Sequence, residues 1–128
     1  MTIRWQPHRT ERGLDLVYMW ATGSITKAEA EEHTRRTSAG GDLFTTPILI
    51  VADTGAGVSP EARQVYGSSN FKERQVPGAI VAPGAPLRVL VSFLLRVSGA
   101  AGNTRVFSNQ ADAVAWLEAS MLKPDALP

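Results

Sequence analysis

The chain has 128 residues, the size of one domain that can bury a core without disulfides or metal ions. Its composition, 44% hydrophobic and 20% charged residues, is typical of a globular protein, and the absence of cysteine excludes disulfides, thiolate metal sites and cysteine nucleophiles. The formal net charge of +1 provides no electrostatic basis for nucleic-acid binding.

The beginning of the chain predicts a hairpin followed by a polar helix. Residues 3–6 alternate in polarity and favour a short edge strand that Pro7 ends, and residues 14–21 favour a longer strand that pairs with it. Thr26 and Glu29 have the spacing of a capping box, in which each side chain binds a free backbone N–H of the other residue. A polar helix is therefore expected directly after Thr26.

The rest of the chain predicts three strands, each followed by a helix. Residues 46–53 form a continuous apolar run that suits a central strand covered on both faces. Ser59 and Pro60 begin a helix, the serine as its N-cap and the proline at its first position. Two further strands are expected at 78–82 and 104–107, before helices at 86–98 and about 110–122.

The order of these elements is β-β-α-β-α-β-α-β-α, which predicts an α/β fold. Alternation of strands and helices implies right-handed crossovers and a mostly parallel sheet, and the opening hairpin makes this five-stranded sheet mixed. We expect one domain over residues 1–123 and a flexible C-terminal tail at 124–128.

The helix at 86–98 is apolar on more sides than a single contact covers. Only Arg88, Ser92 and Arg96 interrupt an apolar arc of roughly 240°, whereas packing on one sheet face needs about 100°. The surplus predicts a homodimer interface, an apolar pocket, or a helix held between the sheet and a neighbouring helix. The residues that would form this interface or pocket are Leu87, Leu90, Val91, Phe93, Leu94 and Val97. Arg88 and Arg96 are candidate contacts for an anion, or are simply solvated.

The end of the chain resembles the SpoIIAA-like group of the STAS superfamily, also labelled STAS/SEC14-like, whose members are related to anti-sigma-factor antagonists. The residues that carry this resemblance are the strand Arg105-Val106-Phe107-Ser108 and the helical residues Ala111 and Ala113-Val114-Ala115-Trp116-Leu117. It extends over nearly the whole chain. It implies a small non-enzymatic domain with four helices and five strands that binds a partner protein, a nucleotide or an apolar ligand. The SEC14 label implies a lipid pocket.

The same resemblance points to a regulatory loop after the central strand. Anti-sigma-factor antagonists carry an Asp-Ser-Ser-Gly-like motif there, and a partner kinase phosphorylates the serine. This chain has Asp53-Thr54-Gly55-Ala56-Gly57-Val58-Ser59, in which Asp53 matches but the Ser-Ser pair is absent. Thr54 and Ser59 are the possible phosphoacceptors, with Gly55 and Gly57 between them. The alternative is a glycine-rich turn that leads into a helix N-cap.

We expect a regulatory, protein-binding domain rather than an enzyme, since the sequence shows neither a nucleophile–base pair nor a metal-ligand cluster, and no cofactor is predicted. His8 and His33 are expected at the surface. The alternative function is binding of a lipid or another apolar small molecule in a pocket under the helix at 86–98. Residues 1–13 lack the apolar segment of a signal peptide, and no apolar run is long enough to span a bilayer, so we expect a cytoplasmic location and no transmembrane segment.

Overall fold

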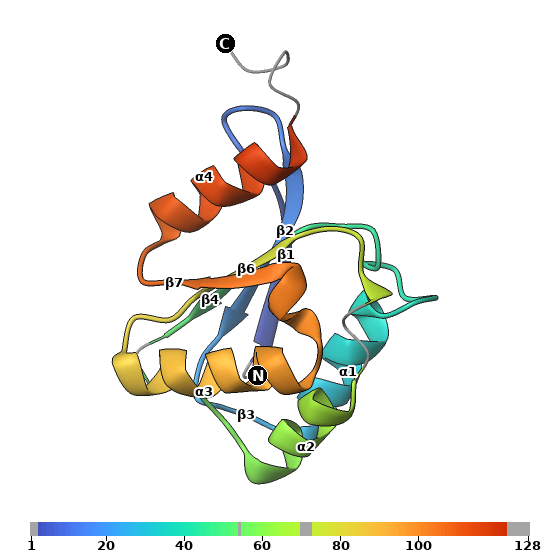
Figure 1. Cartoon of the computed structure of the whole chain (residues 1–128), viewed down its shortest axis with the longest axis vertical. Coiled ribbons are helices and arrows are strands. Elements are labelled where there is room, and N and C mark those ends of the chain that lie inside the picture. Colours follow the sequence, from blue (N-terminus) through green and yellow to red (C-terminus); the bar gives the residue numbers. More distant parts are fainter. Residues whose placement is uncertain (1–2, 54, 70–72, 123–128) are drawn as a thin grey trace.

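A twisted five-stranded sheet divides the protein into two layers of helices (Figure 1). The computed structural model describes residues 3–53, 55–69 and 73–122, so the tail predicted at 124–128 lies outside the described residues. The strands of the main sheet are β1 (Ile3–Arg9), β2 (Asp15–Ala21), β4 (Ile48–Ala52), β6 (Gly78–Val81) and β7 (Thr104–Phe107). The helices are α1 (Lys27–Thr37), α2 (Pro60–Ser68), α3 (Ala85–Val97) and α4 (Gln110–Met121), and a 3-10 turn, η2 (Ala100–Gly102), follows α3.

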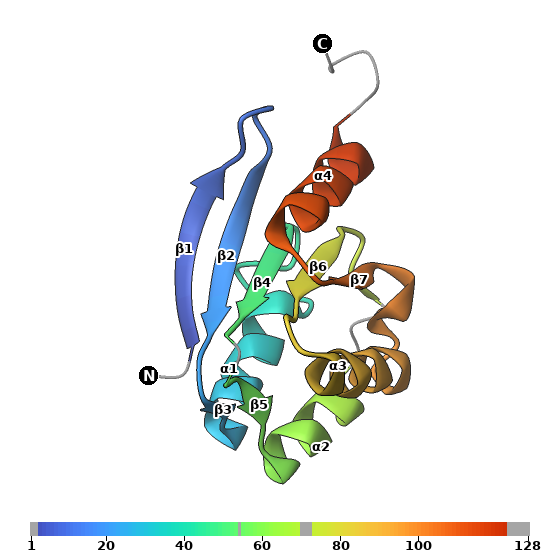
Figure 2. The ribbon, with the colours of Figure 1, turned by 90° about the vertical axis from the view of Figure 1, so that its left-hand side faces the viewer.

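The strands lie in the order β1-β2-β4-β6-β7, as Figure 2 shows. Only β1 is antiparallel to its neighbour, and the other pairs are parallel. This arrangement confirms the predicted mixed, mostly parallel five-stranded α/β sheet and the order of its main elements. Within the part of the chain that the structure describes, no helix is long and apolar enough to cross a membrane.

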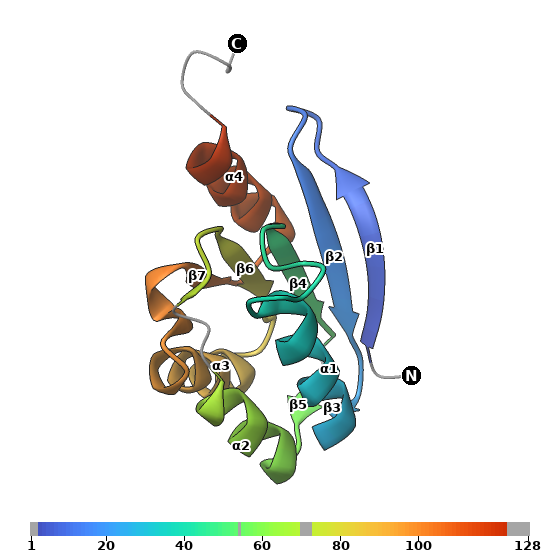
Figure 3. The same cartoon turned by 90° about the vertical axis from the view of Figure 1, so that its right-hand side faces the viewer.

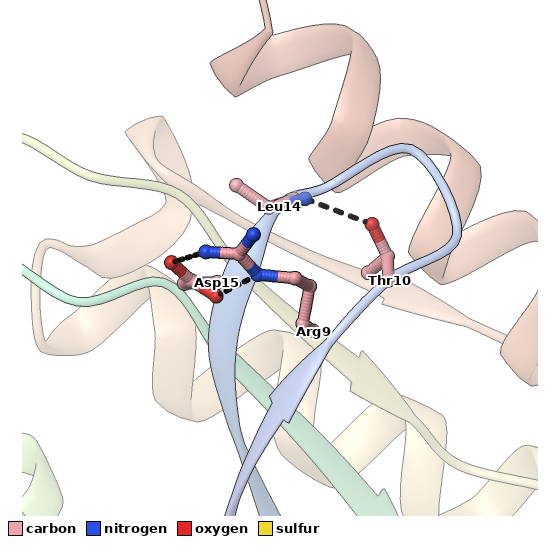
Figure 4. A network of polar contacts seen from close by, with 4 residues as sticks. All are labelled: Arg9, Thr10, Leu14 and Asp15. Atoms are coloured by element: carbon pink, nitrogen blue, oxygen red, sulfur yellow. Dashed lines mark hydrogen bonds and ion pairs between the residues drawn. The ribbon is translucent and has the colours of Figure 1, made fainter.

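The first strand is longer than the sequence predicted. β1 continues through Pro7, which lies opposite Val17, and ends at Arg9. The prediction that Pro7 ends the strand is wrong because β1 is an edge strand, where a residue without an N–H is tolerated. Figure 4 shows the end of this hairpin, where Arg9 Nε lies 2.8 Å from Asp15 Oδ1 and the Thr10 hydroxyl accepts the Leu14 N–H at 3.1 Å.

A second, two-stranded sheet was not predicted. It pairs β3 (Ser24–Ile25) in parallel with β5 (Gly57–Val58), which the sequence had placed inside a loop. Two residues are too few to show the alternation by which a strand is recognised. The Ser59 N–H continues the pairing by donating to the Ile25 carbonyl at 3.0 Å, so this sheet holds the starts of α1 and α2 together.

Strand alternation gives the main sheet two distinct apolar faces. On β2, Val17 and Met19 face the layer of α1, α2 and α3, whereas Leu16 and Tyr18 face α4. Figure 3 shows α1, α2 and α3 gathered under the first face, with α2 beside α3. We call these the three-helix face and the α4 face. The candidate functional site lies on the three-helix face.

Candidate functional site

An apolar cavity of about 120 Å³ lies between the sheet and α3. Its floor is the three-helix face of β2, β4 and β6, with Met19 and Ile50 among the lining side chains. α1 and α2 close one side through His33 and Tyr66. The α3 residues that line it are Leu87, Val91, Leu94, Leu95 and the adjoining Ser98.

The wide apolar arc of α3 is divided between this cavity and the solvent. Leu94 is buried, while Val89, Phe93 and Val97 are 70%, 53% and 48% exposed. Of the six apolar residues predicted to form an interface or pocket, Leu87, Val91 and Leu94 line the cavity. Leu90 and Phe93 line an open groove outside it, and Val97 is exposed.

This outer groove runs between α3 and the segment from β5 into α2. It shares part of its lining with the cavity, namely Ala56, Gly57, Val58 and Leu87. Pro86, Leu90 and Phe93 add apolar surface to the groove. We call the four residues that line both spaces the shared wall.

The two predicted anion contacts on α3 have different positions. Arg88 is half-buried and its Nη1 donates to the Ala82 carbonyl at 2.8 Å, which fixes the end of β6 to α3. Arg96 is exposed and lines the outer groove. Arg63 of α2 lines the same groove, and its Nε donates to the Val58 carbonyl at 3.0 Å. Arg63 was not predicted as a site residue, because nothing in the local pattern of the sequence indicates that α2 lies beside α3.

A hydrogen-bonded pair, His33 and Tyr66, forms the polar end of the cavity. His33 Nδ1 lies 2.8 Å from the Tyr66 hydroxyl oxygen, and both side chains are buried. Burial, together with the charge of Arg74, lowers the pKa of His33 to about 4, so the ring is neutral near pH 7. Burial likewise raises the pKa of Tyr66. The expectation that His33 lies at the surface is wrong, because the side of α1 that carries it packs against α2 and against Trp5.

Arg74 closes the cavity beside this pair. Its guanidinium donates to three main-chain carbonyls, those of Thr37, Leu43 and Thr46, at 2.9, 3.1 and 2.8 Å. These bonds attach the segment after α1 to the segment before β6. Arg74 is therefore a structural cation whose donors are directed at the backbone.

The predicted regulatory loop is only partly described. Thr54 lies outside the described residues. The Asp53 N–H donates to the Ala21 carbonyl and the Asp53 carbonyl accepts the Ala56 N–H, each at 2.9 Å. Gly55 has open space around it, and Gly57 pairs with Ser24. The Ser59 hydroxyl accepts the Ala62 N–H at 3.1 Å, so Ser59 is the N-cap of α2 that the sequence predicted.

Residues 3–53, 55–69 and 73–122 hold no group of three or more His, Asp or Glu side chains placed to bind a metal ion. Among these described residues, every buried side-chain nitrogen or oxygen has a hydrogen-bond partner. The buried polar side chains around the cavity therefore already have hydrogen-bond partners, and the lining offers a ligand mainly apolar contact.

No family model matches this chain, and no curated protein matches it. Among solved structures it is similar to an uncharacterized protein of the DUF3478 family with a SpoIIAA-like fold from Shewanella loihica PV-4. The TM-score is 0.61 and the sequence identity 21%, over 90% of this chain and 93% of that one. At this identity the likeness shows the fold and no activity. The predicted SpoIIAA-like fold is therefore confirmed.

Proposed function

We propose that this SpoIIAA-like domain binds an apolar small molecule in the cavity under α3. The observation that carries this proposal is the cavity itself, lined mainly by aliphatic side chains of β2, β4, β6 and α3. Empty space in a protein interior is costly, because the lining atoms lose their dispersion contacts. A ligand that fills the space restores those contacts.

The size of the cavity sets the size of the group it accepts. An apolar cavity of about 150 Å³ in another protein stays dry and binds benzene. A cavity of about 120 Å³ is therefore suited to a group slightly smaller than a benzene ring, such as a short or branched hydrocarbon segment. The neutral His33 and Tyr66 pair and the occupied Arg74 favour an uncharged group inside.

The test is a titration of the protein with benzene and with xenon, in which two-dimensional NMR spectra report binding as chemical-shift changes. We expect saturable shifts at Met19, Ile50 and Leu94. Val91→Phe should fill the cavity and abolish them, whereas Val89→Phe, the same change on the exposed side of α3, should leave them unchanged. Absence of saturable shifts in the unaltered protein, or equal binding by the two variants, would contradict the proposal.

A regulatory role through protein binding is the second candidate, favoured by the exposed side chains Val89, Phe93 and Val97 on one side of α3. In this role a second copy of the domain would cover α3. Sedimentation velocity over a range of concentrations tests it. Self-association that Phe93→Ser abolishes supports it, and a monomer at high concentration contradicts it.

We further propose that the domain acts in the cytoplasm as a non-enzymatic binding module without a cofactor. In the second candidate function, regulation through protein binding, phosphorylation of Thr54 or Ser59 would control the binding. Replacement of both residues by alanine, with unchanged self-association and partner binding, would argue against control at this loop.

A further inference from the structure

We propose that the ligand is a single-chain anionic amphiphile, whose tail enters the cavity and whose head binds Arg63 and Arg96 in the outer groove. This inference rests on the proposed function and specifies its ligand class. Two observations support it. The cavity and the groove have the four residues of the shared wall in common, and the cavity lining is mainly apolar whereas the groove lining includes the cationic Arg63 and Arg96.

The shared wall is the path for the tail. Leu87 and residues 56–58 line both spaces. On the β5 side the wall is held by a two-residue parallel pairing, in which the Gly57 N–H donates to the Gly23 carbonyl at 3.0 Å. On the α3 side it depends on the Leu87 side chain, which is half-buried. In this proposal, rotation of the Leu87 side chain joins the two spaces while the main sheet stays in place.

The cavity is too small for a whole medium-length alkyl chain, so part of the chain lies in the cavity and part in the groove. By comparison with benzene in a cavity of about 150 Å³, the interior accepts about four or five carbon atoms. The remaining carbons of a medium-length chain then lie in the groove, where Pro86, Leu90 and Phe93 provide apolar contact. This arrangement also covers part of Phe93, which is 53% exposed.

The charges place the anionic head outside the cavity. Inside, His33 is neutral near pH 7 and the Arg74 donors bind backbone carbonyls. In the groove, Arg63 and Arg96 come from two helices that pack together, and none of the described residues lining the groove is acidic. Among the described residues no acceptor binds the two Nη groups of Arg63, since only its Nε donates, to Val58. Guanidinium groups form paired hydrogen bonds with carboxylate or phosphate oxygens.

The test compares octanoate with octan-1-ol at neutral pH, both below the concentration at which they aggregate, by isothermal titration calorimetry. The two probes have the same chain length and differ in the charge of the head. We expect octanoate to bind at least about tenfold more tightly at low ionic strength, and the difference to shrink as salt is added. Arg63→Gln combined with Arg96→Gln should reduce octanoate binding to the level of octan-1-ol and leave octan-1-ol binding unchanged.

A matched control removes the same charge elsewhere. Arg12→Gln combined with Arg105→Gln alters two exposed arginines outside the groove and should leave the preference for octanoate intact. Equal binding of the two probes by the unaltered protein, or full octanoate binding by the Arg63 and Arg96 variant, would overturn this inference. So would binding to anionic vesicles with no binding of monomeric octanoate.

The benzene experiment separates this inference from the proposed function. If benzene binds and neither eight-carbon probe does, the wall does not open and the amphiphile inference fails alone. If benzene, octanoate and octan-1-ol all fail to bind, the proposed function fails as well.

Discussion

The two faces of the sheet are covered by helices in different ways. On the α4 face one helix covers the strands, and Leu49, Ala79, Ala113 and Leu117 have no exposed surface. On the three-helix face, α1, α2 and α3 together leave a cavity of about 120 Å³, with buried His33, Thr37 and Arg74 around it. The difference between the two faces is therefore the cavity and the buried polar side chains beside it.

This difference is what the proposed ligand binding on the three-helix face would lead us to expect. Dense apolar packing without polar neighbours yields the most stabilisation per residue, since every contact is retained and no polar group is desolvated. A face that keeps a cavity and buried polar side chains gives up part of that stabilisation. Such a cost is typical of a binding site, and we expect the two faces to respond differently to the same changes.

The largest expected effect comes from truncating one leucine on each face. Leu117→Ala should lower the free energy of unfolding by about 4 kcal/mol, because it opens a new cavity in a fully buried position. Leu94→Ala should cost less, about 2.5 kcal/mol, since Leu94 already borders empty space and loses fewer contacts. Urea denaturation measures both values. An equal or larger cost at Leu94 would contradict the contrast between the faces.

The next effect concerns pH and belongs to the three-helix face alone. The pKa of His33 is about 4 in the folded protein, whereas an unperturbed histidine, as in the unfolded chain, has a pKa of 6.5. The unfolded chain therefore binds a proton more readily than the folded protein. This contribution to stability is complete above about pH 6.5 and is lost as the pH falls toward 4. At about 1.4 kcal/mol per pKa unit it amounts to about 3 kcal/mol.

The variant His33→Gln isolates this contribution, since glutamine can retain a hydrogen bond to Tyr66 but does not titrate. We expect the free energy of unfolding of the unaltered protein to fall more steeply between pH 7 and pH 4 than that of the variant. Carboxylates elsewhere titrate in both proteins and cancel in the difference. Parallel pH profiles would show that the histidine is not buried as described.

A smaller effect should be the same on both faces. Ser59 caps α2 and Asn109 caps α4, each by accepting a backbone N–H three residues later. Replacement of either by alanine should cost about 1 kcal/mol, because a helix cap is a local interaction. Thermal denaturation measures the two variants side by side. Ser59→Asp should restore most of the loss, since aspartate also caps and is favourable at a helix N-terminus.

The smallest effect is expected beyond both faces, at the Arg9–Asp15 ion pair of the hairpin. Both side chains are about two thirds exposed, at 69% and 70%, so solvent screens their attraction. Arg9→Ala should leave the denaturation midpoint unchanged within error. A clear loss would show that this end of the hairpin contributes to stability, in contrast to both helical layers.

Local patterns predicted much of the fold. Runs of apolar residues located β4 and β6, and the capping patterns at Thr26 and Ser59 located the starts of α1 and α2. The excess of apolar residues between 86 and 98 indicated that α3 does more than cover the sheet. Each of these signals is short-range, because strand alternation and helix capping depend on residues only a few positions apart.

The candidate site could be predicted only in part. The sequence identified α3 and Arg96, but not that Arg63 lines the same groove, which depends on α2 lying beside α3. It also placed His33 at the surface, because burial of a polar side chain depends on Tyr66, a partner 33 positions away.

The sequence by itself determined the order and type of the main elements and the surplus apolar surface of α3, since these follow from local spacing. Only the tertiary structure decided how that surface is shared between a cavity, a groove and the solvent. It also decided that β1 runs through Pro7 at the edge of the sheet and that β3 pairs with β5. The physical reason is that these outcomes depend on contacts between residues distant in the chain, which no local pattern encodes.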